Sequence, residues 1–363
     1  MSRLEELIQE LCPNGVCYYY IEDIAKITRG RVISKQYIIE NEGEYPVYSS
    51  QTENNGELGF ISTYDFDGEY LTWTTDGANA GSVFYRNGKF SITNVCGLIE
   101  IVDSFVMIRF LYYILSVEAK KYVNRGMGNP KLMSNVMAKV KIPVPPLEVQ
   151  REIVRILDHF TELTAELTTE LTARKKQYEY YRDHLLTFGD DVPLVKLGDI
   201  ATIRTGRKPK HINDEKCGYE YINAGTTNCE GDTVTTPSRG QGGIGFVGYQ
   251  LTPFWLGPLC YKIRAQQDNV LNKYIFYILS SYKQTIVALK KEGGTPAVNA
   301  SDLGLIKIPL PSLEKQQRIV DILDRFDTLC NDLTAGLPAE IEVRQKQYEY
   351  YRDKLLTFEP LAD

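Results

Sequence analysis

Segments rich in arginine, lysine, asparagine, glutamine, serine and threonine recur along the chain, and such side chains suit contact with DNA. Arginine can bind guanine, and asparagine or glutamine can bind adenine, through paired hydrogen bonds, whereas serine, threonine and lysine bind phosphates. The candidate DNA-binding residues of the first half are Arg29, Arg31, Lys35, Ser49, Gln51, Thr52, Thr75, Asn79, Arg125, Asn129 and Lys131. Those of the second half are Arg204, Arg207, Lys208, Lys210, Thr226, Asn228, Arg239, Gln241, Lys290, Lys291 and Thr295.

A single segment of this kind is more often a solvated turn than a DNA contact. Two basic segments, however, occupy equivalent places in the two halves, Arg29-Gly-Arg31 and Arg204-Thr-Gly-Arg207. Their recurrence favours a shared role in binding, and DNA is the ligand that the side-chain types indicate.

The distribution of charge supports this hypothesis in one half more than in the other. The whole chain has a formal net charge of −6. Residues 192–312 nevertheless contain 14 Lys and Arg against 9 Asp and Glu, a net charge of +5, as a phosphate-binding surface requires. Residues 1–146 contain 14 against 17, a net charge of −3, which weakens the DNA hypothesis for the first half.

Motifs for catalysis and for cofactors are missing from the sequence. There is no G-x-x-x-x-G-K-[ST] loop, and Cys and His residues form neither a metal pattern nor a catalytic pair. Gly243-Ile-Gly-Phe-Val-Gly248 fits G-x-G-x-x-G, but Pro253 and Pro258 follow, so no helix can begin there and dinucleotide binding is not expected. We therefore expect no catalytic residue, metal or cofactor on this chain.

The most specific pattern is a repeat. Residues 174–188 and 344–358 differ at only two of fifteen positions, Lys175/Gln345 and His184/Lys354. The identity includes positions outside the apolar seam, although the surrounding globular regions have diverged, so something beyond helix packing preserves the pattern. Tyrosine and arginine are enriched at protein-interface hot spots. The predicted partner-docking residues are Gln177, Tyr178, Tyr180, Tyr181, Arg182, Gln347, Tyr348, Tyr350, Tyr351 and Arg352.

The repeated blocks lie in segments with the heptad spacing of a coiled coil. From Ile153 to Phe188 the seam positions alternate spacings of four and three, and residues 147–188 contain no Gly or Pro, which predicts one helix of about 60 Å. The second copy has four additional residues, among them Gly336 and Pro338, which predict a break or kink. Since each helix follows a globular region, we expect the two to pack antiparallel.

The globular regions have a mixed α/β pattern. In the first, residues 70–74, 82–84 and 92–101 are predicted strands, and Arg86-Asn-Gly-Lys89 is a hairpin-turn signal. An amphipathic helix is predicted over residues 108–122 and again over 271–286. The expected organisation is an N-terminal helix of the helical framework (1–16), a first recognition domain (17–146), a central helical spacer (147–191), a second recognition domain (192–312) and a C-terminal helical spacer (313–363).

This arrangement resembles the specificity subunit of type I restriction-modification systems, over essentially the full length of the chain. The resemblance rests on the duplicated KQYEYYRD-x-LLTF blocks, the K-I-P-[VL]-P-x-L-E entries to the helices and the repeated I-A-x-I-x-x-G starts. It implies an α/β fold with two target-recognition domains joined by an antiparallel coiled coil with an internal pseudo-twofold repeat. It also implies that each domain reads one half of a split DNA target without being an enzyme itself.

The resemblance further implies partners and cofactors. Two methyltransferase subunits and, through them, restriction subunits are the expected partners besides double-stranded DNA; S-adenosylmethionine, ATP and Mg would belong to those partners. The open alternative is an adaptor that binds proteins through its coiled coil and tyrosine-rich heads. The start of the chain has no signal-peptide core, no apolar run reaches the ~20 residues of a membrane span, and the cysteines are scattered, so we expect a cytoplasmic protein without disulfides.

Overall fold

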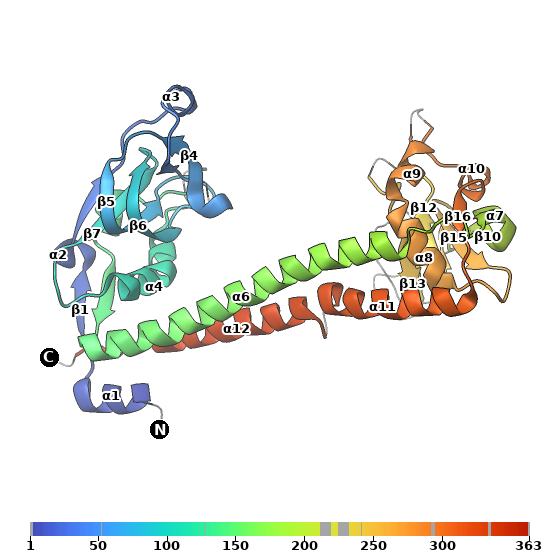
Figure 1. Ribbon diagram of the computed structural model, residues 1–363. Coiled ribbons are helices and arrows are strands. Elements are labelled where there is room, and N and C mark those ends of the chain that lie inside the picture. The colour runs from blue at the N-terminus through green and yellow to red at the C-terminus, as the bar shows by residue number, and fades with distance from the viewer. Residues whose placement is uncertain are drawn as a thin grey trace. The chain divides into compact units, whose positions relative to one another are not determined.

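The computed structural model describes residues 3–51, 53–126, 128–210, 219–223, 232–240, 242–291, 295–332 and 335–361. The chain divides into two units, unit 1 (Met1–Glu166 and Glu342–Asp363) and unit 2 (Leu167–Ile341). Each unit combines a mixed α/β head with helical segments (Figure 1). The prediction of two α/β domains with a long helix between them is confirmed, whereas the domain boundaries given above stay a prediction.

Unit 1 contains a six-stranded sheet with the strand order β2-β7-β5-β6-β3-β4. β3 and β6 pair in parallel, and the other neighbours are antiparallel. A separate pair, β1 with β8, lies beside the helical segments. The strand bounds are β1 Cys17–Tyr20, β2 Ala25–Arg29, β3 Tyr45–Tyr48, β4 Glu57–Ile61, β5 Phe66–Thr74, β6 Val83–Ile92, β7 Cys96–Ile101 and β8 Lys141–Val144.

The core of unit 1 lies between this sheet and α4, which contacts β5 and β6. The buried residues of α4 lie three and four positions apart, as on the packed side of an amphipathic helix: Phe110, Leu111, Tyr113, Ile114 and Leu115. The helical elements are α1 Arg3–Leu11, α2 Ile21–Ile24, α3 Lys35–Glu40, η1 Glu53–Gly56, α4 Ile108–Glu118, η2 Ala119–Tyr122 and α5 Ser134–Met137.

The predicted hairpin turn at residues 86–89 is wrong, because β6 continues through it for ten residues. β5 pairs with β6 from Phe66↔Phe90 to Trp73↔Val83, so the connection between the two strands lies at residues 75–82 instead. The Asn-Gly step fits inside the strand because Gly88, at φ +96°, faces Gly68 on β5, at φ +137°. Burial of the apolar residues on both sides of this step favours extension over a turn.

Unit 2 contains a four-stranded sheet with the order β10-β15-β12-β13 and two small pairs, β11 with β14 and β16 with β9. α8 packs on β12, β13 and β15, as α4 packs on its sheet in unit 1. β13 begins at Gly248, so the G-x-G-x-x-G sequence leads into a strand, as expected. The bounds are β9 Leu194–Lys196, α7 Leu197–Ile200, β10 Ala201–Thr205, β11 Glu220–Ile222, β12 Thr233–Pro237, β13 Gly248–Gln250, β14 Phe254–Leu256, β15 Cys260–Ala265, α8 Asn272–Ser281, α9 Lys283–Ala288, α10 Ala300–Gly304 and β16 Lys307–Pro309.

The central helix α6 runs unbroken from Leu147 to Leu185, and its residues belong to both units. The C-terminal helical region consists of two helices, α11 (Leu313–Asn331) and α12 (Leu337–Leu355). The break predicted from Gly336 and Pro338 is thus confirmed. Pro338 is the second residue of α12, close to the helix start, where the missing N–H costs little.

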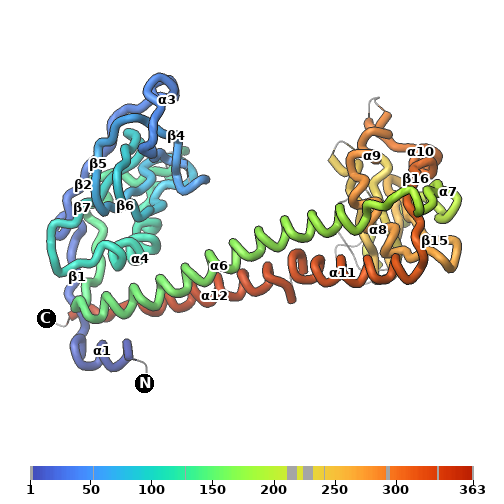
Figure 2. Tube along the Cα trace, in the orientation of Figure 1, coloured from blue at the N-terminus to red at the C-terminus, as the bar shows by residue number. Residues whose placement is uncertain are grey.

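Within each unit, α6 packs against one of the C-terminal helices. In unit 1 the Phe160 ring stacks on the Tyr351 ring of α12 at 5.4 Å, and α12 runs beside the first part of α6 in the opposite direction (Figure 2). In unit 2 the Tyr181 ring stacks on the Phe326 ring of α11, also at 5.4 Å. These contacts join a seam phenylalanine of one helix to the same tyrosine of the repeated block in both units.

A buried glutamine fastens α6 to the head of unit 1. The Gln150 side chain is fully buried, and its Oε1 accepts a hydrogen bond from the Met107 amide at 2.8 Å. Its Nε2 donates to the carbonyls of Phe105 and Pro145, each at 2.8 Å. One side chain therefore ties the first turn of α6 to the segment that leads into α4.

We call the three hydrogen bonds of such a buried glutamine the glutamine clasp, and unit 2 repeats the glutamine clasp with Gln316 at the start of α11. Gln316 Oε1 accepts from the Leu271 amide at 3.0 Å, and its Nε2 donates to the carbonyls of Asn269 and Pro311 at 2.9 Å. Like Gln150, Gln316 is fully buried. The duplication is thus preserved in polar contacts as well as in the apolar seam.

The end of the chain closes unit 1. The Val16 amide donates to the Glu359 carbonyl at 2.9 Å, and the Leu361 amide donates to the Val16 carbonyl at 2.9 Å. The tyrosine block that precedes residue 359 therefore leads to β1 in space, just as the block at the end of α6 leads to β9 along the chain. Unit 1 is a circularly permuted version of the arrangement in unit 2.

Candidate nucleic-acid interface

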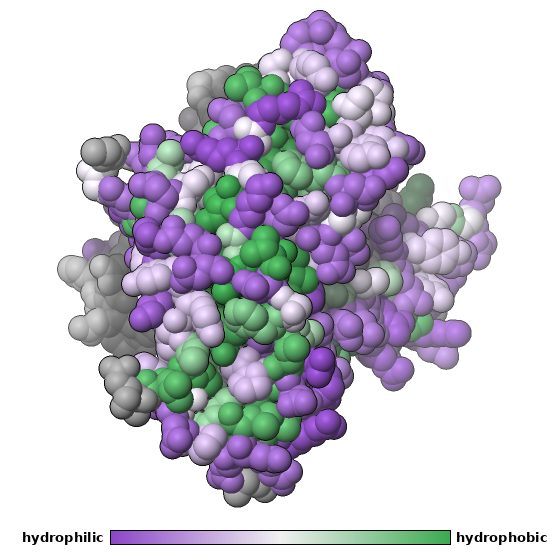
Figure 3. All heavy atoms as spheres, turned by 90° about the vertical axis from the view of Figure 1, so that its left-hand side faces the viewer, coloured by the Kyte–Doolittle hydropathy of each residue, from purple (hydrophilic) through white to green (hydrophobic). Residues whose placement is uncertain are grey.

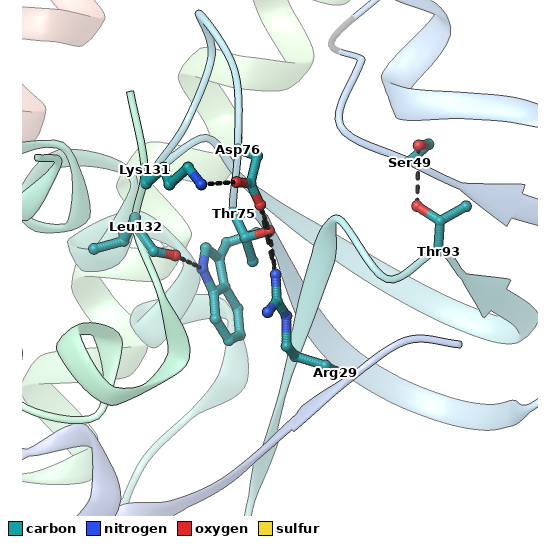
Figure 4. Close-up of polar contacts among 8 residues, drawn as sticks. Arg29, Ser49, Thr75, Asp76, Thr93, Lys131 and Leu132 are labelled. Carbon is teal, nitrogen blue, oxygen red and sulfur yellow. Dashed lines mark hydrogen bonds and ion pairs between the residues drawn. The ribbon is translucent and has the colours of Figure 1, made fainter. Parts of the chain in front are cut away.

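Three of the predicted residues of unit 1 converge at the end of β5 (Figure 4). The Arg29 guanidinium donates to Thr75 Oγ1 at 3.0 Å and lies 3.5 Å from Asp76 Oδ2. Lys131 Nζ lies 3.5 Å from Asp76 Oδ1, and Thr75 Oγ1 donates to Asp76 Oδ2 at 2.6 Å. Asp76 therefore holds two cations and a hydroxyl together, and its charge offsets theirs.

The supporting structure of this cluster is the buried Trp73. Its indole N–H donates to the Leu132 carbonyl at 2.9 Å, which holds the segment that carries Lys131 against β5 (Figure 4). A Cβ at Gly97, on the neighbouring strand, would lie about 2 Å from the indole ring atoms, so only glycine admits this ring. A second link joins the Gly77 amide to the Pro130 carbonyl at 3.0 Å.

Two further predicted residues, Ser49 and Gln51, lie in the loop after β3. Ser49 Oγ is 3.0 Å from Thr93 Oγ1, and Gln51 Nε2 donates to the Glu57 carbonyl. These bonds order the loop, and Figure 4 shows the Ser49–Thr93 pair apart from the Asp76 cluster. The structure therefore places the predicted residues of unit 1 in more than one group.

The sequence reading missed Arg86, a buried cation beneath this loop. Its Nε donates to Thr72 Oγ1 at 3.2 Å and its Nη2 to the Asn55 carbonyl at 2.7 Å, while the guanidinium lies 3.5 Å from the centre of the Tyr48 ring. Burial lowers the pKa of the Arg86 guanidinium. Arg86 precedes Asn87-Gly88, which indicated a turn, so the sequence predicted an exposed side chain there and not a buried one.

The other predicted residues of unit 1 are more dispersed. Arg31 Nε donates to both oxygens of Asp65, the nearer at 3.0 Å. Burial lowers the pKa of Arg31, but hydrogen bonds and charge interactions with Asp65 and Tyr37 together outweigh burial and raise the pKa. Lys35 is the first residue of α3. The remaining three lie in the turn between β5 and β6 or in the loop before α5: Asn79, Arg125 and Asn129.

At the position in unit 2 that matches the Asp76 cluster, a backbone contact recurs, but the charged side chain has the opposite sign. The Gly240 amide donates to the Pro296 carbonyl at 3.1 Å, which matches the bond of Gly77 in unit 1. The residue before this glycine is Arg239 in unit 2 and Asp76 in unit 1. At this position a basic side chain of unit 2 therefore replaces the carboxylate that gathers the cations of unit 1.

The basic segment that begins in β10 and continues after it is exposed at Arg204, Arg207, Lys208 and Lys210. Arg204 pairs across the sheet with Lys262, whereas Arg29 pairs with Gly97 one position further along its strand. Since neighbouring strand positions face opposite sides of a sheet, Arg29 and Arg204 extend from different faces. The recurrence in sequence does not make these two arginines equivalent in space.

Lys291 forms an ion pair with Asp302 at 2.7 Å, and the hydrogen bond from Lys291 lowers the pKa of the Asp302 carboxyl. Lys290 and Thr295 lie nearby in the same loop. Four predicted residues lie outside the residues that the structure describes: Thr52, Thr226, Asn228 and Gln241.

The predicted docking residues lie in closely matching environments. Residues 171–190 and 341–360 are buried, half-buried or exposed at the same positions throughout. Tyr178 and Tyr348 are covered, and burial raises the pKa of each to about 12. Tyr180 and Tyr350 are 65% and 62% exposed and meet the next tyrosine ring edge-on.

The two faces differ mainly at one changed position. His184 stacks on the Tyr180 ring with an interplanar angle of 3° at 6.0 Å, whereas Lys354 stands at the same place in the other copy. The covered members, Gln177 and Gln347, each accept a hydrogen bond from the arginine three residues earlier, at 3.0 and 2.9 Å.

No helix in the described part of the chain is both long and apolar enough to cross a membrane. Likewise, no group of His, Cys, Asp and Glu among those residues is arranged to hold a metal ion. Exposed apolar side chains do occur, among them Val32, Ile39 and Val102, and the face in Figure 3 shows hydrophobic patches set in a mainly hydrophilic surface.

Comparison with known proteins gives consistent matches. The family model described as "Type I restriction modification DNA specificity domain" matches residues 13–174 and again 189–343. The type I specificity subunit S.MpnORF507P of Mycoplasma pneumoniae is 37% identical over 359 residues, covering 93% of this chain and 96% of that protein. The specificity subunit of the type I restriction enzyme MpnII from the same organism is 45% identical over 174 residues, covering 47% and 52%.

Solved structures show the same fold at lower identity. The crystal structure of a type I restriction-modification S subunit from M. genitalium matches with a TM-score of 0.69 at 17% identity, covering 94% of this chain and 96% of the other. A chain from a study of complex assembly and conformational transition in the type I system matches with a TM-score of 0.59 at 16% identity, covering 95% and 98%.

Proposed function

Because the chain belongs to the type I restriction-modification DNA specificity family, we propose that it is the subunit that selects the DNA sequence for such an enzyme. Each head reads one half of a split target, and the helical segments set the gap between the halves. The observation that carries the proposal is the repetition inside the two units, which share the glutamine clasp and the tyrosine block. Two equivalent heads suit a bipartite DNA site, which favours the specificity subunit over the adaptor alternative.

The two tyrosine blocks serve, in this proposal, as twin docking faces for two methyltransferase subunits. Their matched exposure supports this role, because identical partners require identical surfaces. Exposed Tyr180 and Tyr350 supply amphipathic rings of the kind that anchor protein interfaces. Restriction subunits join the assembly through the methyltransferases.

The chain itself carries out no catalysis in this proposal. Methyl transfer from S-adenosylmethionine, and cleavage that depends on ATP and Mg, take place on the partner subunits. The complex works in the cytoplasm, where its DNA target and these cofactors occur together. What this chain contributes is position: it brings the partners to a chosen sequence.

Recognition is divided between the edges of the two heads. In unit 1 the Asp76 cluster presents Arg29 and Lys131 in a set geometry, which suits base reading better than unspecific phosphate binding. In unit 2 the exposed cations Arg204, Arg207 and Arg239 favour contact with the DNA backbone. The heads therefore read their half-sites with a different balance of forces.

A domain exchange tests the proposal. The chain is produced with its methyltransferase subunits, and methylated adenines are mapped across a genome. Replacing residues 192–312 with the corresponding segment of another family member should change one half of the recognised sequence and leave the other half and the gap unchanged. Exchange of residues 17–146 is the matched control and should change only the opposite half. Methylation that ignores both exchanges would refute the proposal.

A further inference from the structure

The outer face of the sheet in unit 2 carries three cations in a row. Arg204 on β10 pairs directly with Lys262 on β15, and Arg264 lies two residues further along β15, opposite Thr202. Residues paired across strands, and residues two apart on one strand, share a face of the sheet. Ile203 and Ile263 occupy the opposite face, and Ile263 is fully buried.

Like charges in this arrangement repel each other. Cβ atoms of directly opposed residues lie about 5 Å apart, and like charges there destabilise the pair. Within the part of unit 2 that the structure describes, neither Arg204, Lys262 nor Arg264 forms an ion pair with a carboxylate. An anion bound between them would relieve the repulsion.

The same face forms one wall of a cleft of about 590 Å³. Arg207, Lys262 and Arg264 line it together with Trp255, which is 46% exposed. The Trp255 indole N–H donates to the Arg207 carbonyl at 2.7 Å, which holds the ring at the cleft beside the cations. The cleft thus combines positive charge with an aromatic surface.

The carboxylate in the cleft, Asp232, has other partners. Its Oδ1 accepts a hydrogen bond from the Tyr249 hydroxyl at 2.5 Å, and its Oδ2 accepts one from Asn272 Nδ2 at 3.0 Å. Burial, and then this hydrogen bond, raise the pKa of Tyr249. Asp232 is therefore held by its neighbours and is not paired with the cations of the cleft.

The corresponding face of the sheet in unit 1 carries different side chains. Its strands pair Lys26 with Glu100, whose charged atoms lie 4.0 Å apart, and Thr28 with Leu98. Leu98 is buried in a small apolar cluster that includes Phe90. The row of cations is a property of unit 2 and is not a general feature of this fold.

We propose that the cleft lined by Arg207, Lys262, Arg264 and Trp255, with Arg204 beside it on β10, binds phosphate groups of the DNA backbone; we call this surface the phosphate cleft. This inference rests on the proposed function. Arginine forks and a lysine ammonium match phosphate oxygens, and an indole face packs on a sugar or base. The cleft holds the duplex by charge, in addition to the loops that read the sequence.

The chain provides a matched control for the repulsion. Lys196 on β9 and Lys307 on β16 are also directly opposed and exposed, but they do not line the cleft. The double variant Lys196→Gln/Lys307→Gln removes the same charge from the same unit as Lys262→Gln/Arg264→Gln. A difference between the two variants then reports the cleft and not the net charge.

Tryptophan fluorescence measures occupancy of the cleft in the full chain. The chain has only two tryptophans, and Trp73 is fully buried in unit 1, so Trp255 is the exposed reporter. A short duplex DNA should change the Trp255 emission in the wild type and in the control variant, and not in Lys262→Gln/Arg264→Gln. Trp255→Phe identifies the signal as that of Trp255. Unchanged Trp255 emission at saturating DNA would overturn the inference.

The salt dependence of DNA binding gives a second measurement. Loss of two phosphate contacts should reduce the slope of log K against log salt by about 1.8, at roughly 0.9 per contact, in the cleft variant alone. A response of Trp255 to inorganic phosphate, with an unchanged DNA slope, would overturn the assignment to the DNA backbone. Absence of DNA binding by the wild type at low salt would instead contradict the proposed function itself.

Discussion

Replacing Gln150 with leucine tests how firmly the helical framework holds a recognition head. Leucine has nearly the volume of glutamine but removes three hydrogen bonds, each of 2.8 Å, to Met107, Phe105 and Pro145. A hydrogen bond contributes about 1 kcal/mol net, and the three abandoned backbone groups lie at a buried or half-buried site. We expect the free energy of unfolding of unit 1 to fall by about 3 kcal/mol.

Urea unfolding followed by Trp73 emission measures this loss, because Trp73 is fully buried in unit 1. In a Trp255→Phe background Trp73 is the sole tryptophan. With a dependence of about 2 kcal/mol per molar urea, the midpoint should fall by about 1.5 M. The control is Gln36→Leu, which removes only the exposed bond to Glu40 on α3 and should change stability by less than about 0.5 kcal/mol.

The clasp has a signature that separates it from a general loss of stability. The amide of Met107 should exchange its hydrogen faster in Gln150→Leu, and the amide of Leu271 faster in Gln316→Leu, since each loses its acceptor. If Gln150→Leu shifted the midpoint no more than Gln36→Leu, the clasp would not be what fastens the head to α6.

Three further predictions concern docking, pH and spacing. Tyr180→Ala combined with Tyr350→Ala should weaken assembly with methyltransferase subunits at least tenfold in titrated gel filtration while circular dichroism stays unchanged; undiminished assembly would count against the docking faces. Burial, followed by the hydrogen bond to Asp158, raises the pKa of Tyr113. The stabilisation of the folded state by the protonated phenol is therefore present below about pH 10 and is lost as pH rises further. The stability difference between wild type and Tyr113→Phe should narrow in alkaline urea titrations, and a constant difference would contradict this. Deleting one heptad from α6 and one from α11 should shorten the unspecified gap in mapped methylation sites with both half-sequences kept, and an unaltered gap would exclude a helical ruler.

The repeat allowed much of the architecture to be predicted, because its sequence signals are local and periodic. Seam spacing predicted α6 almost to its ends, and Gly336 with Pro338 predicted the break before α12. Gly, Pro and heptad signals operate within a few residues of chain, so they can be read without knowledge of the fold. The same locality misled the reading of Asn87-Gly88, where pairing with β5 overrode a turn signal.

The candidate sites depended more on contacts distant in sequence. The types and positions of side chains singled out Arg29, Thr75 and Lys131 as candidates, yet nothing in the sequence indicated that one carboxylate, Asp76, gathers all three. Pairing across strands also decided that Arg204 stands beside Lys262, which lies 58 residues later.

From the sequence we could infer a duplicated chain whose halves end in matching helices, and the family resemblance indicated DNA binding. Which charges are paired, and which remain open to an anion, depended on the folded structure. The physical reason is that periodic apolar patterns are properties of neighbouring residues, whereas electrostatic pairing depends on atoms brought within a few ångströms by strand register. The register of these strands matches in the two heads, but different side chains stand at the matching positions.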